Sequence, residues 1–273
     1  MNKLLRYAGS KDTYVSLINP EINRTNKTTY VEPFLGSGGV FINLEKDFDN
    51  YIINDIDPAI VRIFKTVKES SYEEFILFYE RVICKYGNFK TSRDSILKEQ
   101  YKKNYYNFRN DFNKKLWKTN TQEEGFALIL IYNSCLNSLA RWGPNGFNQS
   151  WGDRMFIPDK SSWDIIQSRL KRTKIYNKDF FELINTIDNI DDCLLFLDPP
   201  YISAPSFAYK TINTNYYKDF LTFCKETHAH ILYTDVDHDD LEFTKLTLRD
   251  NMRNISPNRK EEFKKKEIMF INF

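Results

Sequence analysis

The sequence lacks the features that mark disulfide-rich, zinc-binding and membrane-spanning proteins. Its four cysteines are widely spaced, and without a Cys-x-x-Cys pair no zinc site is indicated. A chain of 273 residues does not need a disulfide framework. No uncharged apolar run reaches the roughly 18 residues of a membrane-spanning helix, and no apolar signal segment opens the chain. We therefore expect an intracellular protein whose cysteines are all buried apolar residues. They are Cys84, Cys135, Cys193 and Cys224.

A strong charge of either sign is also lacking. Lysine and arginine number 39 against 37 aspartates and glutamates, a net charge of +2. Any nucleic-acid site must therefore come from locally clustered charge. Histidine is scarce as well. His228, His230 and His238 form no ligand cluster, so we assign neither a metal site nor a catalytic histidine.

The apolar segments predict an α/β fold. A strand at 29–34 ends at a glycine-rich turn, and a helix at 40–46 follows. A second strand at 51–54 leads into a helix at 58–68. This order begins a doubly wound, mostly parallel, Rossmann-like sheet. Further strands are expected at 174–177, 194–197 and 229–234, and 251–255 is expected to pair antiparallel with 267–271.

The α/β rhythm is interrupted between residues 70 and 173. Residues 71–118 are aromatic and charged with helical spacing, 125–139 are apolar and read as a helix, and 141–152 are rich in glycine and asparagine. The sequence predicts a catalytic domain built from 1–69 and 174–273, with a mainly helical insert at 70–173.

Asp198-Pro199-Pro200-Tyr201 directly follows the apolar run 194–197. Ligands of open α/β sheets bind at the carboxyl ends of strands. One chemistry that suits this pattern is reaction at the exocyclic amino group of a nucleobase such as adenine, which is a poor nucleophile because its lone pair is delocalised into the ring. Two acceptors, the Asp198 carboxylate and the Pro199 carbonyl, would accept hydrogen bonds from its two N–H groups and localise that lone pair on the nitrogen. Tyr201 offers a face for an extruded base. The alternative is an Asp-Pro turn with a packing tyrosine.

A second motif, Phe34-x-Gly36-x-Gly38-Gly39, lets the backbone approach a ligand closely at the end of the first strand. Asp55, which follows the second strand, can accept hydrogen bonds from a ribose or an amino group. A dinucleotide site competes with this interpretation, but the spacing departs from Gly-x-Gly-x-x-Gly and no redox motif follows. A structural turn with an N-capping aspartate is the other alternative.

Taken in order, these segments resemble the Dam-type DNA adenine methyltransferases over nearly the whole chain. The shared elements are Tyr7–Lys11, Phe34–Gly38, Asn54-Asp55, the insert, Asp198–Tyr201 and Glu267–Asn272. The resemblance implies S-adenosyl-L-methionine as cofactor, and double-stranded DNA as partner, in the cytoplasm of a bacterium or encoded by its phage. The oligomeric state, monomer or weak dimer, stays open. The implied cofactor-binding residues are Tyr7, Lys11, Phe34, Gly36, Gly38, Asp55, Asp179, Phe180 and Asp198.

Within the insert, residues 81–118 contain eleven Lys or Arg and three Asp or Glu, with aromatic residues interleaved. This concentration suggests a surface that follows DNA phosphates, although a charge run on a helix is often only a solvated face. We expect phosphate contacts from Lys102, Lys103, Lys114 and Lys115.

The segment Asn137–Asn148 resembles the family's base-reading hairpin. Arg141 matches the arginine that reaches base edges, a role that suits a guanidinium bidentate to guanine. Asn137 and Leu139 belong to the same segment, and Arg6 matches a basic position near the target. Gln149-Ser150-Trp151-Gly152 departs from the family's usual proline before an aromatic and glycine, so the familiar GATC target does not follow for this chain. An ordinary glycine-rich hairpin is the alternative.

Together these features predict a site-specific DNA adenine-N6 methyltransferase that acts by base flipping. Asp198, Pro199, Pro200 and Tyr201 are the candidate catalytic residues. Methyl transfer from a sulfonium needs no Lewis acid, so no metal is implied. Two alternatives stay open: methylation of the cytosine amino group, and a DNA-binding relative that has lost turnover.

Overall fold

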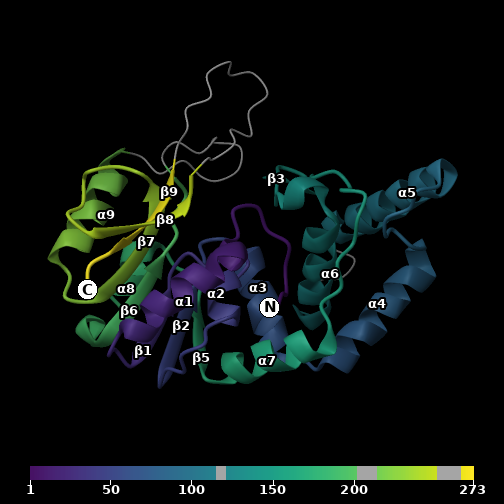
Figure 1. Cartoon of the computed structure of the whole chain (residues 1–273). Coiled ribbons are helices and arrows are strands. Elements are labelled where there is room, and N and C mark those ends of the chain that lie inside the picture. The colour runs from purple at the N-terminus through teal and green to yellow at the C-terminus, as the bar shows by residue number, and fades with distance from the viewer. Residues whose placement is uncertain (115–120, 202–213, 251–265) are drawn as a thin grey trace, which may run out of the picture. The chain divides into compact units, whose positions relative to one another are not determined.

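The computed structural model of the chain describes residues 1–114, 121–201, 214–250 and 266–273. These residues form two compact units, and the chain passes between them several times. Figure 1 labels the elements in chain order. Unit 1 contains Met1–Asp12, Gly36–Asn43 and Asp57–Ile175, and unit 2 contains Thr13–Leu35, Leu44–Ile56 and Tyr176–Phe273. The predicted insert 70–173 lies wholly within unit 1, and its role as a separate recognition part stays a prediction.

Unit 2 holds most of a seven-stranded sheet with the strand order β5-β2-β1-β6-β7-β9-β8. Strands β2, β1, β6 and β7 pair in parallel, and β9 runs antiparallel to both of its neighbours. The predicted mostly parallel α/β sheet is confirmed. The strands are β1 (Thr29–Glu32), β2 (Asn50–Asn54), β5 (Thr173–Tyr176), β6 (Cys193–Leu197), β7 (His230–Val236), β8 (Thr244–Arg249) and β9 (Glu267–Ile271), and the helices of unit 2 are α1 (Val15–Arg24), α8 (Phe180–Ile184) and α9 (Thr214–Glu226).

The predicted pairing at the C-terminal end is corrected in one respect. Strand β9 has the predicted bounds, but its neighbours are β7 and β8, and the sequence reading missed β8. Residues 251–255, the predicted partner, lie outside the described residues. The β8 segment escaped detection because it shows only one buried residue, Leu248, so its apolar pattern is weak.

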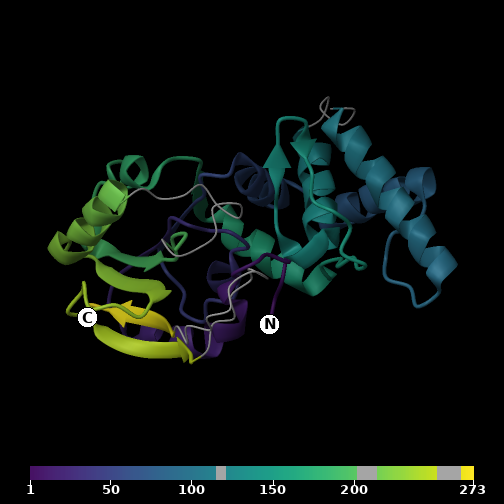
Figure 2. The same ribbon diagram turned by 90° about the horizontal axis from the view of Figure 1, so that it is seen from above.

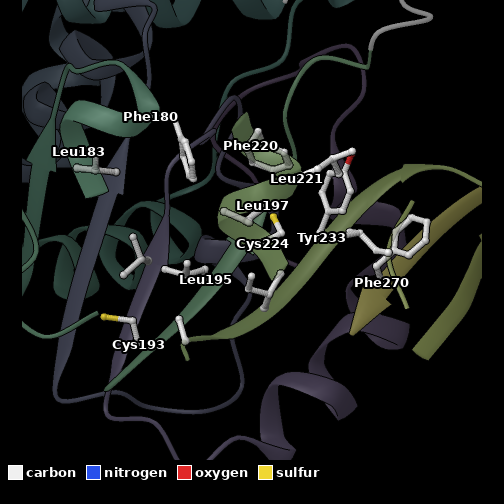
Figure 3. Packing of buried hydrophobic residues seen from close by; sticks show 14 of the residues in the cluster. Phe180, Leu183, Cys193, Leu195, Leu197, Phe220, Leu221, Cys224, Tyr233 and Phe270 are labelled. Carbon is white, nitrogen blue, oxygen red and sulfur yellow. The ribbon is translucent and has the colours of Figure 1, made fainter. Parts of the chain in front are cut away.

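The core of unit 2 packs the inner faces of α8 and α9 against the central strands. In Figure 3, Phe180 of α8 and Phe220 of α9 lie over Leu197 of β6, and Tyr233 of β7 lies near Phe270 of β9. All five residues of β6 are buried, as expected for a central parallel strand covered on both faces. This packing fixes the strand ends from which the candidate catalytic residues extend.

Unit 1 is mainly helical (Figures 1 and 2). A capping aspartate begins α3, since Asp57 accepts from the Ala59 N–H at 2.9 Å and Pro58 stands at the first helical position. Trp163 is fully buried and stacks on Phe75, with ring centroids 5.1 Å apart. The helices of unit 1 are α2 (Gly39–Ile42), α3 (Pro58–Glu69), α4 (Tyr72–Tyr86), α5 (Ser95–Asn113), α6 (Thr121–Ser134) and α7 (Lys160–Lys171), and its strands are β3 (Trp142–Gly143) and β4 (Gly146–Phe147). Short 3-10 turns lie at Leu136–Ser138 in unit 1, at Ile190–Asp192 in unit 2 and at Lys11–Tyr14, where the chain passes from unit 1 to unit 2.

Two helices end earlier than predicted. The helix expected at 40–46 is the four-residue α2, because the Asn43 side chain donates to the Gly39 carbonyl at 2.9 Å and closes the turn. The helix expected at 125–139 ends at Ser134, because Asn137 and Ser138 adopt left-handed backbone conformations with φ of 55° and 57°. Backbone bonds to the returning end of the hairpin replace the missing helical ones: Leu136 N–H donates to Ser150 O at 2.8 Å.

The cysteine prediction is wrong for Cys84, which is exposed on α4, whereas Cys135, Cys193 and Cys224 are buried. Burial raises the pKa of the Cys135 and Cys193 thiols to about 12, so both stay protonated. Over the described ranges, no helix combines the length and apolar character that crossing a membrane requires. In the same part of the chain, no group of three His, Cys, Asp or Glu residues is arranged to hold a metal ion.

Helices α3 and α6 approach each other closely at Gly125. A Cβ atom at Gly125 would lie 1.9 Å from Thr66 Oγ1 and 2.5 Å from Thr66 Cβ. Rotation of the Thr66 side chain removes the first clash but not the second, because the Cβ position is fixed by the backbone. A glycine inside a helix costs about 1 kcal/mol relative to alanine, and here the close approach of the two helices outweighs that cost.

We expect Gly125→Ala to destabilise the protein by about 1–3 kcal/mol, although helix propensity alone predicts stabilisation by about 1 kcal/mol. Urea unfolding followed by circular dichroism measures the change. Asn107→Ala, at an exposed position of α5, is the control and should change stability by less than about 0.5 kcal/mol. A Gly125→Ala protein more stable than the wild type would show that the helices separate freely and that the packing account is wrong.

Candidate active site

The segment Asp198–Tyr201 leaves the carboxyl end of β6, and its two ends are hydrogen-bonded to neighbouring strands. Thr234 Oγ1 on β7 donates to Asp198 Oδ1 at 2.6 Å. The Tyr201 hydroxyl donates to Glu267 Oε1 on β9 at 2.8 Å. Burial raises the pKa of Tyr201 well above its ordinary value, and the nearby carboxylates of Asp198 and Glu267 raise it further. The hydroxyl is therefore protonated and able to donate at neutral pH.

A second buried carboxylate, Asp235, lies near the end of β7. It accepts hydrogen bonds from the hydroxyls of Tyr217, at 3.1 Å, and Tyr233, and from the Val236 N–H at 2.6 Å. Burial raises the pKa of Asp235, and these donors oppose the shift. His238, in the loop after β7, stacks on Phe270 and accepts from the Asp240 N–H.

Asn54, the last residue of β2, links three chain segments of unit 2. Its side-chain N–H groups donate to the carbonyls of Pro33, at 2.9 Å, and Lys178, at 3.0 Å, and its Oδ1 accepts from the Lys178 N–H at 2.9 Å. Its backbone carbonyl accepts from Leu35 N–H at 3.0 Å. Asn54 is itself buried, so the residues that follow β1, β2 and β5 start from a fixed backbone.

Three cofactor candidates of unit 2 lie beside this link. Asp55 is buried, and its carbonyl accepts from the Asn177 side chain at 2.7 Å. Phe34 stacks on Phe180, with ring centroids 5.4 Å apart and an interplanar angle of 14°. Asp179 caps α8 through the Phe181 N–H and also accepts from the Tyr216 hydroxyl at 2.8 Å. Phe180 is only 2% exposed, so it also belongs to the core of unit 2.

The N-terminal segment and the glycine-rich turn, both in unit 1, are packed tightly together. Gly36 has φ +50°, and a Cβ there would lie 3.2 Å from the Tyr7 ring. Gly38 also adopts a left-handed conformation, with φ of 66°. The hydroxyls of Ser10 and Ser37 lie 2.8 Å apart in a hydrogen bond. Lys11 is buried, and its ammonium donates to the Gly9 carbonyl at 3.1 Å.

The same N-terminal segment is hydrogen-bonded to the start of the predicted hairpin. Asn133 at the end of α6 accepts from the Arg6 N–H at 2.7 Å and donates to the Leu4 carbonyl at 3.0 Å. The Ala8 N–H donates to Ser138 O at 3.0 Å. Burial and the charge of nearby Arg154 lower the pKa of Arg6, which marks a local concentration of positive charge.

The predicted hairpin is formed by β3 and β4. Arg141 is exposed, and its Nε donates to Asn148 Oδ1 at 2.7 Å across the hairpin. Asn137 is exposed at the base of the hairpin and Leu139 is half-buried. Asn113, the last residue of α5, holds β4 by accepting from the Phe147 N–H at 2.9 Å and donating to its carbonyl at 2.8 Å. These two hydrogen bonds connect the hairpin to the end of α5.

The described part of the basic segment 81–118 is only partly the surface that the sequence suggested. Lys102, Lys103 and Lys114 are exposed, and Lys115 lies outside the described residues. The interleaved aromatics are not all available to a ligand, because Tyr105 and Phe108 are fully buried against neighbouring elements of unit 1. Ion pairs also use part of the positive charge: Arg81–Glu123, Lys85–Asp111, Lys98–Asp153 and Lys102–Glu99.

Sequence reasoning missed four polar residues that hold these segments: Asn54, Asn133, Thr234 and Glu267. Asn54 and Glu267 were noticed only as members of longer motifs, and Asn133 and Thr234 lie in apolar runs. A polar residue in such a run was the one available signal, since a buried polar group requires a hydrogen-bond partner.

Comparison with known proteins gives one family. Residues 7–263 match the family described as D12 class N6 adenine-specific DNA methyltransferase. Type II methyltransferase M.MjaIII of Methanocaldococcus jannaschii is 29% identical over 221 residues, which cover 78% of this chain and 73% of that protein. The DNA adenine methylase of Escherichia coli is 25% identical over 236 residues, covering 83% and 73%. Type II methyltransferase M.CviBI of Paramecium bursaria Chlorella virus NC1A is 22% identical over 237 residues, covering 85% and 77%.

Asn54→Asp keeps the size of the side chain but replaces its two N–H donors by an oxygen that faces two carbonyls. We expect a loss of about 1–3 kcal/mol in the free energy of unfolding, because buried acceptors lose their donors. Urea denaturation at neutral pH measures it. Asn50→Asp makes the same chemical change at the exposed first residue of β2 and should have an effect below about 0.5 kcal/mol. Equal effects of the two substitutions would contradict the linking role of Asn54.

Proposed function

Since this chain belongs to the D12 class of N6 adenine-specific DNA methyltransferases, we propose that it transfers the methyl group of S-adenosylmethionine to an adenine turned out of duplex DNA. The main support for this proposal is the Asp198–Tyr201 segment at the carboxyl end of β6. There the Asp198 carboxylate accepts a hydrogen bond from Thr234, and three residues later the Tyr201 hydroxyl donates one to Glu267. The family membership makes the enzyme a DNA adenine methyltransferase. The donor, the residues and their roles are our proposal.

The described residues fit S-adenosylmethionine, which supplies an electrophilic methyl group on a positively charged sulfur. The glycines of the turn 36–39 have no side chains, so a ligand can approach the backbone of this turn closely. The buried carboxylate of Asp55 suits ribose hydroxyls or an amino group, and the aromatic pair of Phe34 and Phe180 suits an adenine ring. The proposed cofactor-binding residues are Tyr7, Lys11, Phe34, Gly36, Gly38, Asp55, Asp179, Phe180 and Asp198.

For the reaction, Asp198 and the Pro199 carbonyl accept hydrogen bonds from the two N–H bonds of the target amino group. Pro200 keeps the turn rigid, since its ring fixes φ. The Tyr201 ring stacks on the extruded base. These residues position and polarise the amino nitrogen. The rate gain comes from orientation rather than from a covalent intermediate.

For DNA recognition, we propose that residues 70–173 read the target. Arg141, with Asn137 and Leu139 in the same segment, contacts base edges, and Arg6 lies near the target base. Lys102, Lys103 and Lys114 bind phosphates; Lys115 was predicted to do so and lies outside the described residues. The exposure of Arg141, opposite Asn148 at the open end of a hairpin held by Asn113, supports this assignment. We propose that the enzyme works on cytoplasmic DNA and modifies a specific sequence.

Asp198→Ala should lower the rate of methyl transfer by at least about 100-fold while DNA binding is largely retained, because one acceptor of the amino group is lost and the recognition residues are untouched. Transfer of a radiolabelled methyl group to DNA measures the rate, and fluorescence anisotropy measures binding. Asp239→Ala, at a fully exposed aspartate, is the control and should behave as wild type.

Digestion of the reacted DNA to nucleosides and mass spectrometry identifies the product. N6-methyladenine is expected; N4-methylcytosine would support the alternative base, and no product from folded wild-type protein would support an inactive DNA-binding relative. Near-normal turnover of Asp198→Ala would refute the catalytic assignment.

Arg141→Ala should weaken binding to the cognate site by roughly 1–3 kcal/mol, with a much smaller effect on non-cognate DNA. Methylation rates on duplexes that carry each single-base change around the target adenine reveal which position relaxes. The comparison is Lys103→Ala, which should weaken binding to all sequences alike and lower the salt slope by about one unit. If Arg141→Ala slows every duplex by one common factor, Arg141 is not a base-reading residue.

A further inference from the structure

We propose that Thr234 and Glu267 are positioning residues of the methyl-transfer reaction, which hold the two ends of the Asp198–Tyr201 segment. Thr234 fixes the carboxylate of Asp198, and Glu267 fixes the ring of Tyr201. This inference rests on the proposed function of that segment. It adds to that function two side chains that touch neither the base nor the cofactor and act only through the residues they hold.

Thr234 is a buried polar residue near the carboxyl end of β7. It is fully buried on β7, and the parallel register pairs the preceding residue, Tyr233, with Leu197, so Thr234 stands beside Asp198. A valine would fill the same space without a buried hydroxyl, whose burial is unfavourable unless it is hydrogen-bonded. The hydroxyl has one proton to donate, and the 2.6 Å contact to Asp198 Oδ1 is far shorter than the 3.4 Å contact to Leu197 O.

That short contact has a directional consequence. A hydrogen bond to an ionised acceptor is stronger than one between neutral groups, so it restricts rotation of the Asp198 carboxylate about its side-chain bonds. The carboxylate plane decides where an amino N–H can be accepted. Thr234 therefore sets the direction of the acceptor that the reaction requires, from a strand that is itself rigid.

Glu267 holds the other end of the Asp198–Tyr201 segment, where it accepts from the Tyr201 hydroxyl. It is the first residue of β9 and is 6% exposed, paired in register with Val236 of β7 and Arg249 of β8. Besides Tyr201 it bonds the Tyr14 hydroxyl, which also bonds Arg249. Burial of a carboxylate is unfavourable unless it is paired or hydrogen-bonded, so these donors stabilise Glu267 in place. The hydrogen bond of 2.8 Å from the Tyr201 hydroxyl to Glu267 Oε1 fixes where the far end of the ring lies, and so where the ring can meet a base.

The test for Thr234 compares Thr234→Val, which removes the hydroxyl at constant shape, with Thr234→Ser, which keeps it. We expect Thr234→Val to lower the single-turnover methyl-transfer rate roughly 10- to 100-fold at saturating cofactor and DNA. The dissociation constants for both ligands should stay near their wild-type values. Thr234→Ser should recover most of the rate. Should Thr234→Val fail to fold, Thr234→Ala tests the same loss, with rates normalised to the folded fraction.

The test for Glu267 uses a double-mutant cycle with Tyr201→Phe, which removes the anchored hydroxyl but keeps the ring. Glu267→Met should slow transfer, Glu267→Gln should retain most of the rate because its amide oxygen still accepts, and Glu267→Met combined with Tyr201→Phe should be no slower than the slower single variant. The fluorescence of 2-aminopurine at the target position, measured separately from the rates because this base lacks the 6-amino group, adds base stacking as a readout, since stacking on Tyr201 quenches it.

The outcomes separate this inference from the proposed function. Wild-type rates for Thr234→Val and Glu267→Met, with Asp198→Ala inactive, would overturn the positioning roles and leave the proposed function intact. A merely structural role would lower the urea midpoint while the rate per folded molecule stays unchanged, which would also overturn the inference. An active Asp198→Ala protein would refute the proposed function itself.

Discussion

The amide of Asn54 is a constraint on which the ligand-binding edge of unit 2 depends. One planar group donates to the carbonyls of Pro33 and Lys178 and accepts from the Lys178 N–H, while the backbone carbonyl of Asn54 accepts from Leu35. No apolar side chain can make these bonds, and a carboxylate has no protons to donate. Because β1, β2 and β5 are joined at this point, the residues that follow them keep fixed positions. The proposed cofactor contacts of unit 2 inherit their geometry from this one side chain.

At the ends of β6, β7 and β9, unit 2 gathers three carboxylates whose donors are largely hydroxyls. Asp198 is held by Thr234, Asp235 by two tyrosines and Glu267 by Tyr201. A hydroxyl satisfies a carboxylate without cancelling its charge, whereas a lysine or arginine would neutralise it. The negative potential that remains suits the proposed chemistry, in which an amino group presents N–H bonds and a sulfonium carries a positive charge.

Much of this arrangement was predictable from the sequence, and the features that were not predicted depend on contacts between distant parts of the chain or on residues whose pattern carries little information. Runs such as 194–197 locate central strands because a strand covered on both faces must be continuously apolar. Helix ends were less predictable. The early end of α6 depends on bonds from Leu136 to Ser150 that form only when the hairpin folds back. The exposure of Cys84 depends on which face of α4 is packed, and cysteine carries little information about that. The sequence predicted that Thr234 belongs to a strand. Its hydrogen-bond partner, Asp198, is distant in the sequence, and only the register between β6 and β7 brings the two together.

Strand β9 lies between β7 and β8, although it follows both of them in the chain. During synthesis the chain emerges from its N-terminal end at about 5–20 residues per second, so β7 and β8 leave the ribosome before their common partner exists. Until residues 267–271 arrive, both strands carry an unpaired edge, and such edges readily pair with other chains. The arrival of residues 267–271 also brings Glu267 to Tyr201. A nascent or truncated chain without this segment would therefore be prone to aggregate and would also lack the carboxylate that accepts from the Tyr201 hydroxyl.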